Sequence, residues 1–280
     1  TYVLVFVLGA GCYYMYIRLK ISKANADAKT IVEEEQVKKI PLTKEAEMHL
    51  KRMQEKMVLE QEKRIHYVAL ENTEDGLIMP FLHSKSLDYE VEQLIAEKKA
   101  DKALEIIQSF FEDYFKEKEN ECSVRCDYCT EAFKNVFGQK QFSKAMVCAR
   151  NVNIDLILDN IFRSEKGYLL IDGEWIFPFD VPILFVIWRT LNELYSRHTK
   201  INELISRADA MTRFQIDAEM ENIFWNWSTF FVQGYVGGGN FDRFVEPMQW
   251  LDIQKAKPVK MCRMCWRRWL PVFPPRRGTR

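Results

Sequence analysis

The sequence has no excess of charge of either sign and no cysteine pattern typical of secreted domains. Its 280 residues include 40 Lys or Arg and 40 Asp or Glu, and this zero formal net charge argues against nucleic-acid binding along the whole chain. The seven cysteines are an odd number without the spacing of a disulfide framework, which favours a reducing, cytoplasmic setting. A composition of 48% hydrophobic and 29% charged residues excludes global disorder and allows a sizeable core.

A long hydrophobic run is lacking too. Residues 2–16 are strongly apolar, but about fifteen residues fall short of the roughly 20 that span a bilayer. A buried strand followed by a turn at residues 9–11 is the simpler interpretation, and a signal anchor followed by Arg18 and Lys20 is the alternative. The chain starts with Thr1 rather than Met, so we expect it to be part of a longer protein.

Several familiar kinds of site are missing. The four histidines have no metal-binding spacing, and the sequence has no Ser-His-Asp grouping. The pairs Cys126-x-x-Cys129 and Cys262-x-x-Cys265 are about 130 residues apart, against the roughly 15 to 20 of zinc ribbons, so reduced thiols are expected rather than a zinc site. The glycines at 237–239 follow no predicted strand and precede no clear helix, which indicates a turn rather than a nucleotide-binding loop.

Polar residues do occur at a spacing that suits phosphoryl transfer. Asn160 follows Asp155 by five residues, and Asp172 ends an apolar run twelve residues later. Transfer from ATP needs a carboxylate beside the attacking hydroxyl, and an amide oxygen with a second carboxylate for the metal ions. Turn residues at 164–167 between two short strands would bring Asn160 and Asp172 to one edge, where both could bind Mg²⁺. The alternative is an amphipathic helix that carries these residues by chance.

The segment 151–189, with N-I-D-L-I-L-D-N-I-F and Y-L-L-I-D-G-E-W, resembles the protein-kinase-like superfamily. It is closer to aminoglycoside, choline and lipopolysaccharide kinases than to protein kinases. It also resembles kinase-like modules that accompany glycosyltransferase or methyltransferase domains in bacterial polysaccharide-assembly proteins. The similarity is weaker over residues 16–115 and ends near Phe230.

This resemblance implies the roles of individual residues. Asp155 would be the catalytic base, and Asn160 and Asp172 would be the metal ligands. Two departures are present: Asn153 stands where kinases usually have His, and Gly-Glu at 173–174 replaces Phe-Gly after the metal-binding Asp. The glycine-rich loop over the phosphates is missing as well.

The resemblance also implies an α+β fold with two lobes. The small lobe, with an antiparallel sheet, would cover residues 1–81, the mainly helical lobe with the catalytic loop residues 82–235, and an irregular basic tail residues 236–280. ATP would be bound by Lys39, which alternation along a strand places on the same face as Val37, and by Met79 and Phe81 at the hinge between lobes. The alternative for Lys38 and Lys39 is a solvent-facing pair on an edge strand.

Strands are expected at 14–22, as a pair within 28–39, at 67–70 and at 76–81. A helix is expected from Lys44 to about Arg64, and one glutamate among Glu45, Glu47 and Glu55 would pair with the phosphate-binding lysine.

Further helices are expected at 89–98, 102–115, 143–149, 183–195 and 201–227, with a surface insertion at 116–129. Residues 175–183 leave no room for a long polar activation segment, which favours a small-molecule or glycan acceptor over a protein. Arg189 would either pair with a loop carboxylate or lie on the surface.

The last residues are strongly basic. From Lys255 to Arg280 there are nine Lys or Arg and no acid. With Trp266 and Trp269 this suggests peripheral contact with an anionic membrane. The alternative, which Pro271 and the following prolines favour, is an unstructured terminus without a specific role.

The sequence therefore predicts an ATP- and Mg²⁺-dependent phosphotransferase that acts on a hydroxyl of a sugar or surface glycan in polysaccharide biosynthesis. It would work in the cytoplasm or at the inner face of the membrane, beside a glycosyltransferase or methyltransferase domain and without nucleic acid. The alternative is an inactive kinase-like module that binds nucleotide or acts as a scaffold for a glycosyltransferase. A membrane-tethered assembly protein is a third possibility.

Overall fold

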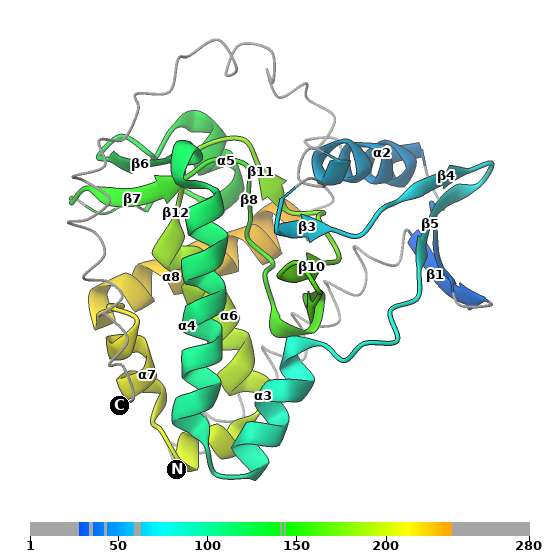
Figure 1. Ribbon diagram of the computed structural model, residues 1–280. Helices are drawn as coiled ribbons and strands as arrows, with labels where there is room; N and C mark the ends of the chain where they lie inside the picture. The colour runs from blue at the N-terminus through cyan, green and yellow to red at the C-terminus, as the bar shows by residue number, and fades with distance from the viewer. Residues whose placement is uncertain are drawn as a thin grey trace, which may run out of the picture.

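The computed structural model describes residues 28–33, 36–41, 44–58, 63–140, 142 and 144–236. Within these residues the fold is α+β, with small and mostly antiparallel sheets, as the sequence predicts. Figure 1 shows the four-stranded sheet and helix α2 on one side of the molecule, and the long helices α4 and α6 on the other. The predicted strand at 14–22, the apolar start, the glycine run and the basic tail lie outside the described residues.

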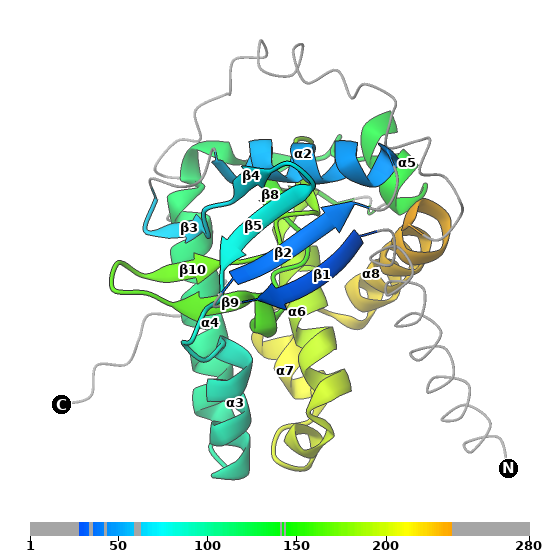
Figure 2. The same ribbon diagram turned by 90° about the vertical axis from the view of Figure 1, so that its right-hand side faces the viewer.

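The four-stranded sheet is antiparallel throughout. Its order is β1 (Ala28–Glu33), β2 (Gln36–Pro41), β5 (Gly76–Pro80) and β4 (Glu71–Thr73), and it faces the viewer in Figure 2 with α2 (Lys44–Val58) above it. Gly76 is required where β5 passes β2, because a Cβ there would lie 2.1 Å from the carbonyl oxygen of Lys39. A side chain at position 76 would therefore displace the strand that carries Lys39.

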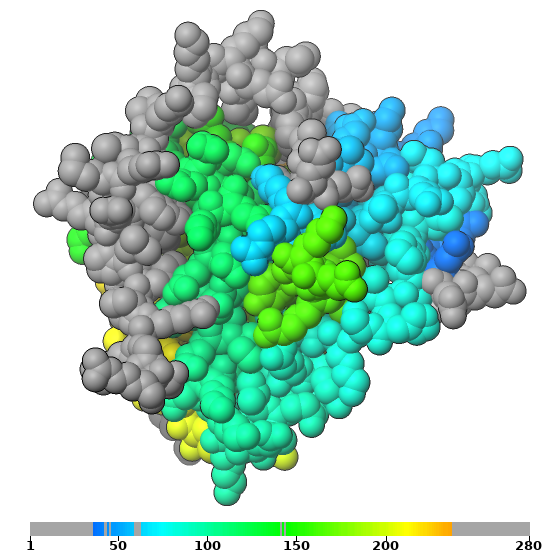
Figure 3. Space-filling view, viewed as in Figure 1, coloured from blue at the N-terminus to red at the C-terminus, as the bar shows by residue number. Residues whose placement is uncertain are grey.

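The other strands are short and belong to three small sheets. β3 (Ile65–Tyr67) pairs in parallel with β10 (Tyr168–Leu170), and β10 pairs antiparallel with β9 (Ile161–Arg163). In Figure 3 the yellow-green atoms of β9 and β10 lie against the blue atoms of β3. The remaining two sheets are β8 (Val152–Asn153) with β11 (Ile176–Phe177), and β6 (Cys122–Arg125) with β7 (Met146–Ala149) and β12 (Val181–Pro182). Residues 151–182 thus contribute strands to each of these three small sheets.

The helices pack around a core rich in aromatic rings. They are α3 (Leu87–Ala96), α4 (Ala100–Glu117), α5 (Glu131–Phe137), α6 (Ile183–Arg197), α7 (Arg207–Arg213) and α8 (Ala218–Phe230), with the π-helical turn η5 (Phe231–Val236) after α8. Three short 3₁₀ turns connect other elements: η2 (Glu119–Glu121), η3 (Leu158–Asn160) and η4 (Thr199–Glu203). Trp188 and Trp227 are fully buried in this core, and α6 contacts the segment that carries Asp155, because Arg189 Nε donates to Ile154 O at 2.8 Å. Among the described helices none is long and apolar enough to cross a membrane.

Several predicted boundaries were wrong, and the capping residues explain one of them. The helix predicted at 201–227 is divided into η4, α7 and α8 because Ser206 and Asp217 accept hydrogen bonds from Asp209 N and Met220 N and so begin new helices. The helix from Lys44 ends at Val58, and the strand predicted at 67–70 is replaced by β3 and β4.

The predicted surface insertion at 116–129 is wrong for a different reason. It contains strand β6, and its Lys118 and Tyr128 are buried. Lys118 Nζ donates to the carbonyl oxygen of Asn151 at 3.0 Å, so a charged residue is accommodated inside the fold. The predicted helix at 143–149 is instead β7, because this segment completes a sheet between β6 and β12.

Candidate active site

Asp172 lies directly after the strand pair β9–β10. Its φ of 61° is in the left-handed region, which Asp and Asn tolerate better than other residues with a side chain. The backbone N–H of the preceding Ile171 donates to Asn160 O at 3.0 Å, and this bond brings the two predicted metal ligands to the same edge. The Asp172 side chain remains 31% exposed, so a ligand in solvent can reach it.

Lys39 reaches Asp172 from the four-stranded sheet. Its Nζ lies 2.8 Å from Asp172 Oδ1 and 3.0 Å from Glu174 Oε1. The neighbouring Lys38 points the other way and pairs with Asp75 at 2.7 Å in the β4–β5 turn. The prediction that Lys39, rather than Lys38, turns inward is therefore confirmed.

Glu174 takes the position beside this lysine that the sequence assigned to a glutamate of α2. Glu47 and Glu55 are exposed on α2, and the side chain of Glu45 lies outside the described residues. Glu174 is only 9% exposed, and its Oε2 lies 3.7 Å from His49 Nε2. The expectation of an α2 partner was thus wrong for Glu47 and Glu55. The missed signal was the second acid two residues after Asp172.

Gly173 lets this segment approach α2. A Cβ at position 173 would lie 2.5 Å from Met57 Cγ and 3.2 Å from Ile176 Cδ1. Met57 is buried, so little space is left for a larger residue between Asp172 and Glu174. The packing of this segment against α2 therefore accounts for a glycine at position 173.

The charges of these three side chains depend on one another. Burial raises the pKa of Asp172 to about 6, and the nearby Glu174 carboxylate adds to this shift, while Lys39 opposes it. Burial alone would also raise the pKa of Glu174, but Lys39 and His49 hold it below its usual value. For Lys39, burial is outweighed by the two carboxylates, so its pKa is raised. One ammonium thus lies between two carboxylates of different acidity.

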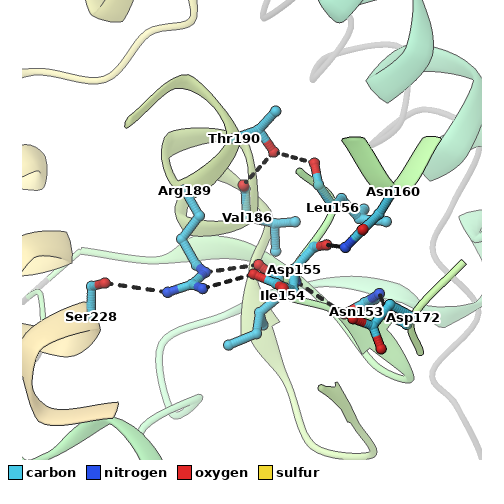
Figure 4. A network of polar contacts seen from close by, with 10 residues as sticks. All are labelled: Asn153, Ile154, Asp155, Leu156, Asn160, Asp172, Val186, Arg189, Thr190 and Ser228. Carbon is cyan, nitrogen blue, oxygen red and sulfur yellow. Dashed lines mark hydrogen bonds and ion pairs between the residues drawn. The ribbon is translucent and has the colours of Figure 1, made fainter. Parts of the chain in front are cut away.

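Asn153 connects Asp172 to the segment that carries Asp155. Its side chain is fully buried, its Nδ2 donates to Asp172 O at 3.1 Å, and its Oδ1 accepts from Asp155 N at 2.9 Å (Figure 4). Asn153 therefore fixes the relative position of the two aspartates.

Asp155 and Asn160 lie on the same loop. Asn160 Nδ2 donates to Asp155 O at 3.2 Å, and Asp155 Oδ1 accepts from Arg189 at 3.0 Å. The structure thus confirms that Arg189 pairs with a loop carboxylate instead of lying on the surface. Asp155, Asn160 and Asp172 are brought together with Lys39, as the sequence predicts.

The residues predicted to bind Mg²⁺ suit that ion in chemistry, although they are few. Asp172 offers a carboxylate and Asn160 an amide oxygen, which are hard ligands of the kind that Mg²⁺ prefers. Asp172 Oδ1 is bonded to Lys39, while its other oxygen is not. Within the described residues no three His, Cys, Asp or Glu side chains form a metal site by themselves.

The predicted adenine-binding residues lie at the end of β5. Met79 is half-buried and lies opposite Val37 in the sheet, two positions from the Lys39–Leu77 pair. Phe81 follows the strand, is 42% exposed, and contacts the His83 ring edge-on. A hinge at these residues and nucleotide binding there both stay predictions.

A comparison of the sequence with models of known protein families finds no match, and neither does a search of curated proteins.

Proposed function

We propose that this protein is a kinase-like phosphotransferase that uses ATP and Mg²⁺ and acts on a hydroxyl of a sugar or surface glycan. The observation that carries the proposal is the convergence of Lys39, Asp155 and Asp172 from separate parts of the chain, with Asn153 bonded to both aspartates. A two-lobed kinase-like arrangement is part of the same proposal, with the four-stranded sheet and α2 as the small lobe.

Each residue then has a defined task. The acceptor oxygen forms a bond to the γ-phosphorus while the bond from that phosphorus to the β,γ-bridging oxygen breaks, and ADP leaves. Asp155 orients the acceptor hydroxyl and takes its proton, and Lys39 holds phosphate oxygens. Asn160 and Asp172 would hold Mg²⁺, which when bound neutralises charge on the phosphates. Met79 and Phe81 would contact the adenine.

The nature of the acceptor is inferred from the short connection after Asp172. The chain passes through β11 and β12 and enters α6 at Ile183, and both strands pair with earlier strands. Residues 173–182 thus leave no room for a long polar segment between Asp172 and α6. Since such a segment would dock a protein substrate, its absence here supports a small-molecule or glycan acceptor.

The association with other components belongs to the proposal as well. The protein would work in the cytoplasm or at the inner face of the membrane, beside a glycosyltransferase or methyltransferase domain. Nucleic acid is not a proposed partner, because the net charge of the chain is zero.

A second function is favoured by one specific observation. Lys39 already has two carboxylate partners, Asp172 and Glu174, and both are next to where phosphates would bind. Such a site suits a module that binds nucleotide or supports a neighbouring glycosyltransferase without turnover. Binding of Mg²⁺–ATP without hydrolysis or transfer to any sugar would favour this alternative.

The deciding experiment is ATP turnover with Mg²⁺ by the wild-type protein and by Asp155→Ala and Asp172→Ala. Asp75→Ala is the matched control, because Asp75 pairs with the adjacent Lys38 in an exposed turn. We expect slow intrinsic hydrolysis that falls at least about 100-fold in both site variants and is unchanged in the control. Absence of both hydrolysis and nucleotide binding in the folded wild-type protein would contradict the proposal.

A further inference from the structure

A single guanidinium group makes three hydrogen bonds around Asp155. Arg189 Nε donates to Ile154 O at 2.8 Å, Nη2 to Asp155 Oδ1 at 3.0 Å, and Nη1 to Ser228 Oγ at 3.2 Å (Figure 4). The side chain is only 12% exposed. Three different nitrogens are thus bonded to three acceptors, which is an arrangement that a lysine cannot reproduce.

The next residue of the same helix holds the other side of the loop. Thr190 Oγ1 donates to Leu156 O at 2.7 Å and contacts Val186 O at 3.4 Å. Adjacent residues of α6 therefore hold the carbonyls immediately before and immediately after Asp155. The backbone of Asp155 is fixed to α6 from both sides, and its side chain is fixed by Arg189.

The contact with Ser228 extends this connection to α8. Arg189 also lies 5.4 Å from the centre of the Phe231 ring, in the turn η5 that follows α8. The orientation of Asp155 therefore depends on the packing of α6 against α8. Both helices are anchored in the aromatic core by Trp188 and Trp227, which are fully buried.

We infer that Arg189 is a positioning residue that fixes the carboxylate of Asp155 and leaves Oδ2 as the oxygen that faces the acceptor hydroxyl. This inference rests on the proposed function. Because Oδ1 is bonded to Nη2, the carboxylate cannot rotate freely, and one oxygen remains to accept the proton. A misplacement by about 1 Å at such a position costs roughly 100-fold in rate.

The alternative is that the ion pair between Arg189 and Asp155 stabilises the fold and has no role in the reaction. Arg207 provides a matched control for that alternative. It too makes three hydrogen bonds, to Glu221 and Asn192, and lies 5.8 Å from the centre of the Trp225 ring. Its contacts do not include the loop that carries Asp155.

The test compares Arg189→Gln, Arg189→Lys and Arg207→Gln in ATP turnover, nucleotide affinity and thermal unfolding. We expect Arg189→Gln to lower kcat about 100-fold with the nucleotide Kd changed less than about threefold, and Arg189→Lys to restore only a small part of the rate. Arg207→Gln should lower Tm by a similar amount and keep kcat. Equal values of kcat in Arg189→Gln and Arg207→Gln would overturn the inference.

A double-mutant cycle separates this inference from the proposed function. The melting temperatures of Arg189→Gln, Asp155→Asn and the double variant do not depend on turnover. If the wild-type protein hydrolyses no ATP, the proposed function fails. The double-mutant cycle still tests whether Arg189 holds the carboxylate of Asp155. If the loss of Tm in the double variant is smaller than the sum of the losses in the two single variants, Arg189 and Asp155 are coupled, as inferred. A loss equal to that sum would overturn the inference.

Discussion

Asp155 and Asp172 are joined through Asn153, yet each is held by a cation from a different part of the chain. Arg189 of α6, which follows both aspartates in the sequence, holds Asp155. Lys39 of β2, more than a hundred residues before them, holds Asp172. The first carboxylate is anchored to the helical core, and the second is anchored to the four-stranded sheet.

The balance of charge differs between the two regions. Around Asp155 one guanidinium meets one carboxylate, so the charges cancel. Around Asp172 one ammonium lies between the carboxylates of Asp172 and Glu174, with His49 3.7 Å from Glu174. Lys56 also interacts electrostatically with Glu174, so this region has two carboxylates and more than one cation. The second carboxylate is the feature that distinguishes it from the surroundings of Asp155, and it agrees with the proposal that Asp172 holds a metal ion while Asp155 serves the acceptor.

We expect the largest loss of stability from Gly76→Ala, which disturbs only the four-stranded sheet that carries Lys39. The new Cβ would meet the backbone oxygen of Lys39 at 2.1 Å, so β2 has to move away from β5. We expect a loss of about 3 kcal/mol in the free energy of unfolding, measured by urea denaturation. Gly234→Ala is the control, because the nearest atom to its Cβ is at 3.5 Å. Equal stability of the two variants would contradict the prediction.

Removal of the Lys39 ammonium, which lies in the same region, should lower the free energy of unfolding by somewhat less. Lys39→Met leaves Asp172 and Glu174 without their shared ammonium, and we expect a loss of about 2 kcal/mol after allowing for the partial exposure of Asp172. The double variant with Glu174→Gln should recover part of this loss. Lys38→Met, whose partner Asp75 is exposed, should leave stability unchanged. Urea denaturation of all three variants provides the measurement.

The connection between the two regions is tested by Asn153→Ala. This change removes one hydrogen bond to Asp172 O and one from Asp155 N at a fully buried position. We expect a loss of about 1.5 kcal/mol in the free energy of unfolding, together with reduced ATP turnover. Asn192→Ala, which removes an acceptor of Arg207, is the control and should retain turnover. Unchanged turnover in Asn153→Ala would show that the aspartates do not depend on this connection.

The smallest effect that we expect is a pH dependence of stability, which arises where α3 and the end of α6 meet. His198 Nε2 lies 2.8 Å from Asp88 Oδ1, and this hydrogen bond raises the pKa of His198, against the opposing effect of burial. A raised histidine pKa contributes stability that is complete below about pH 6.5 and is lost as pH rises through the pKa of the folded state. We expect stability to decline on this alkaline side.

The measurement is chemical denaturation between pH 6 and pH 9 for the wild-type protein and for His198→Gln. The variant should lose this part of the pH dependence, because a neutral amide does not titrate. An identical slope in both proteins would contradict the assignment to His198. Lys39 and its two carboxylates are not changed by the substitution.

Some of these features could be predicted from the sequence because they depend on short stretches of the chain. Asp155, Asn160 and Asp172 were found because their spacing is set by the local chain and by the turn between β9 and β10. Lys39 was chosen over Lys38 because strand alternation is local as well. The helices at α3, α4 and α6 follow from strong apolar periodicity, whereas the α+β class was expected from the resemblance.

The features that were missed depend on contacts between distant segments. Glu174 was missed because its partnership with Lys39 spans 135 positions and no periodicity indicates it. β7 was assigned to a helix because its four residues become a strand only between β6 and β12. The buried Lys118 was placed on the surface because the carbonyl of Asn151 that accepts its hydrogen bond is 33 positions away.

The pairing of β3 with β10 has a consequence for dividing the protein. β3 lies within the first 81 residues, yet its parallel ladder with β10 continues in bonds from Val68 N to Leu170 O at 2.8 Å and from Tyr168 N to Arg64 O at 3.2 Å. A fragment that begins after Phe81 would leave β10 with an open edge, and open edges promote aggregation between copies. A division after Phe81 therefore cuts through this sheet, and a fragment that begins at Lys63 would leave β5 without its partner β2 in the same way.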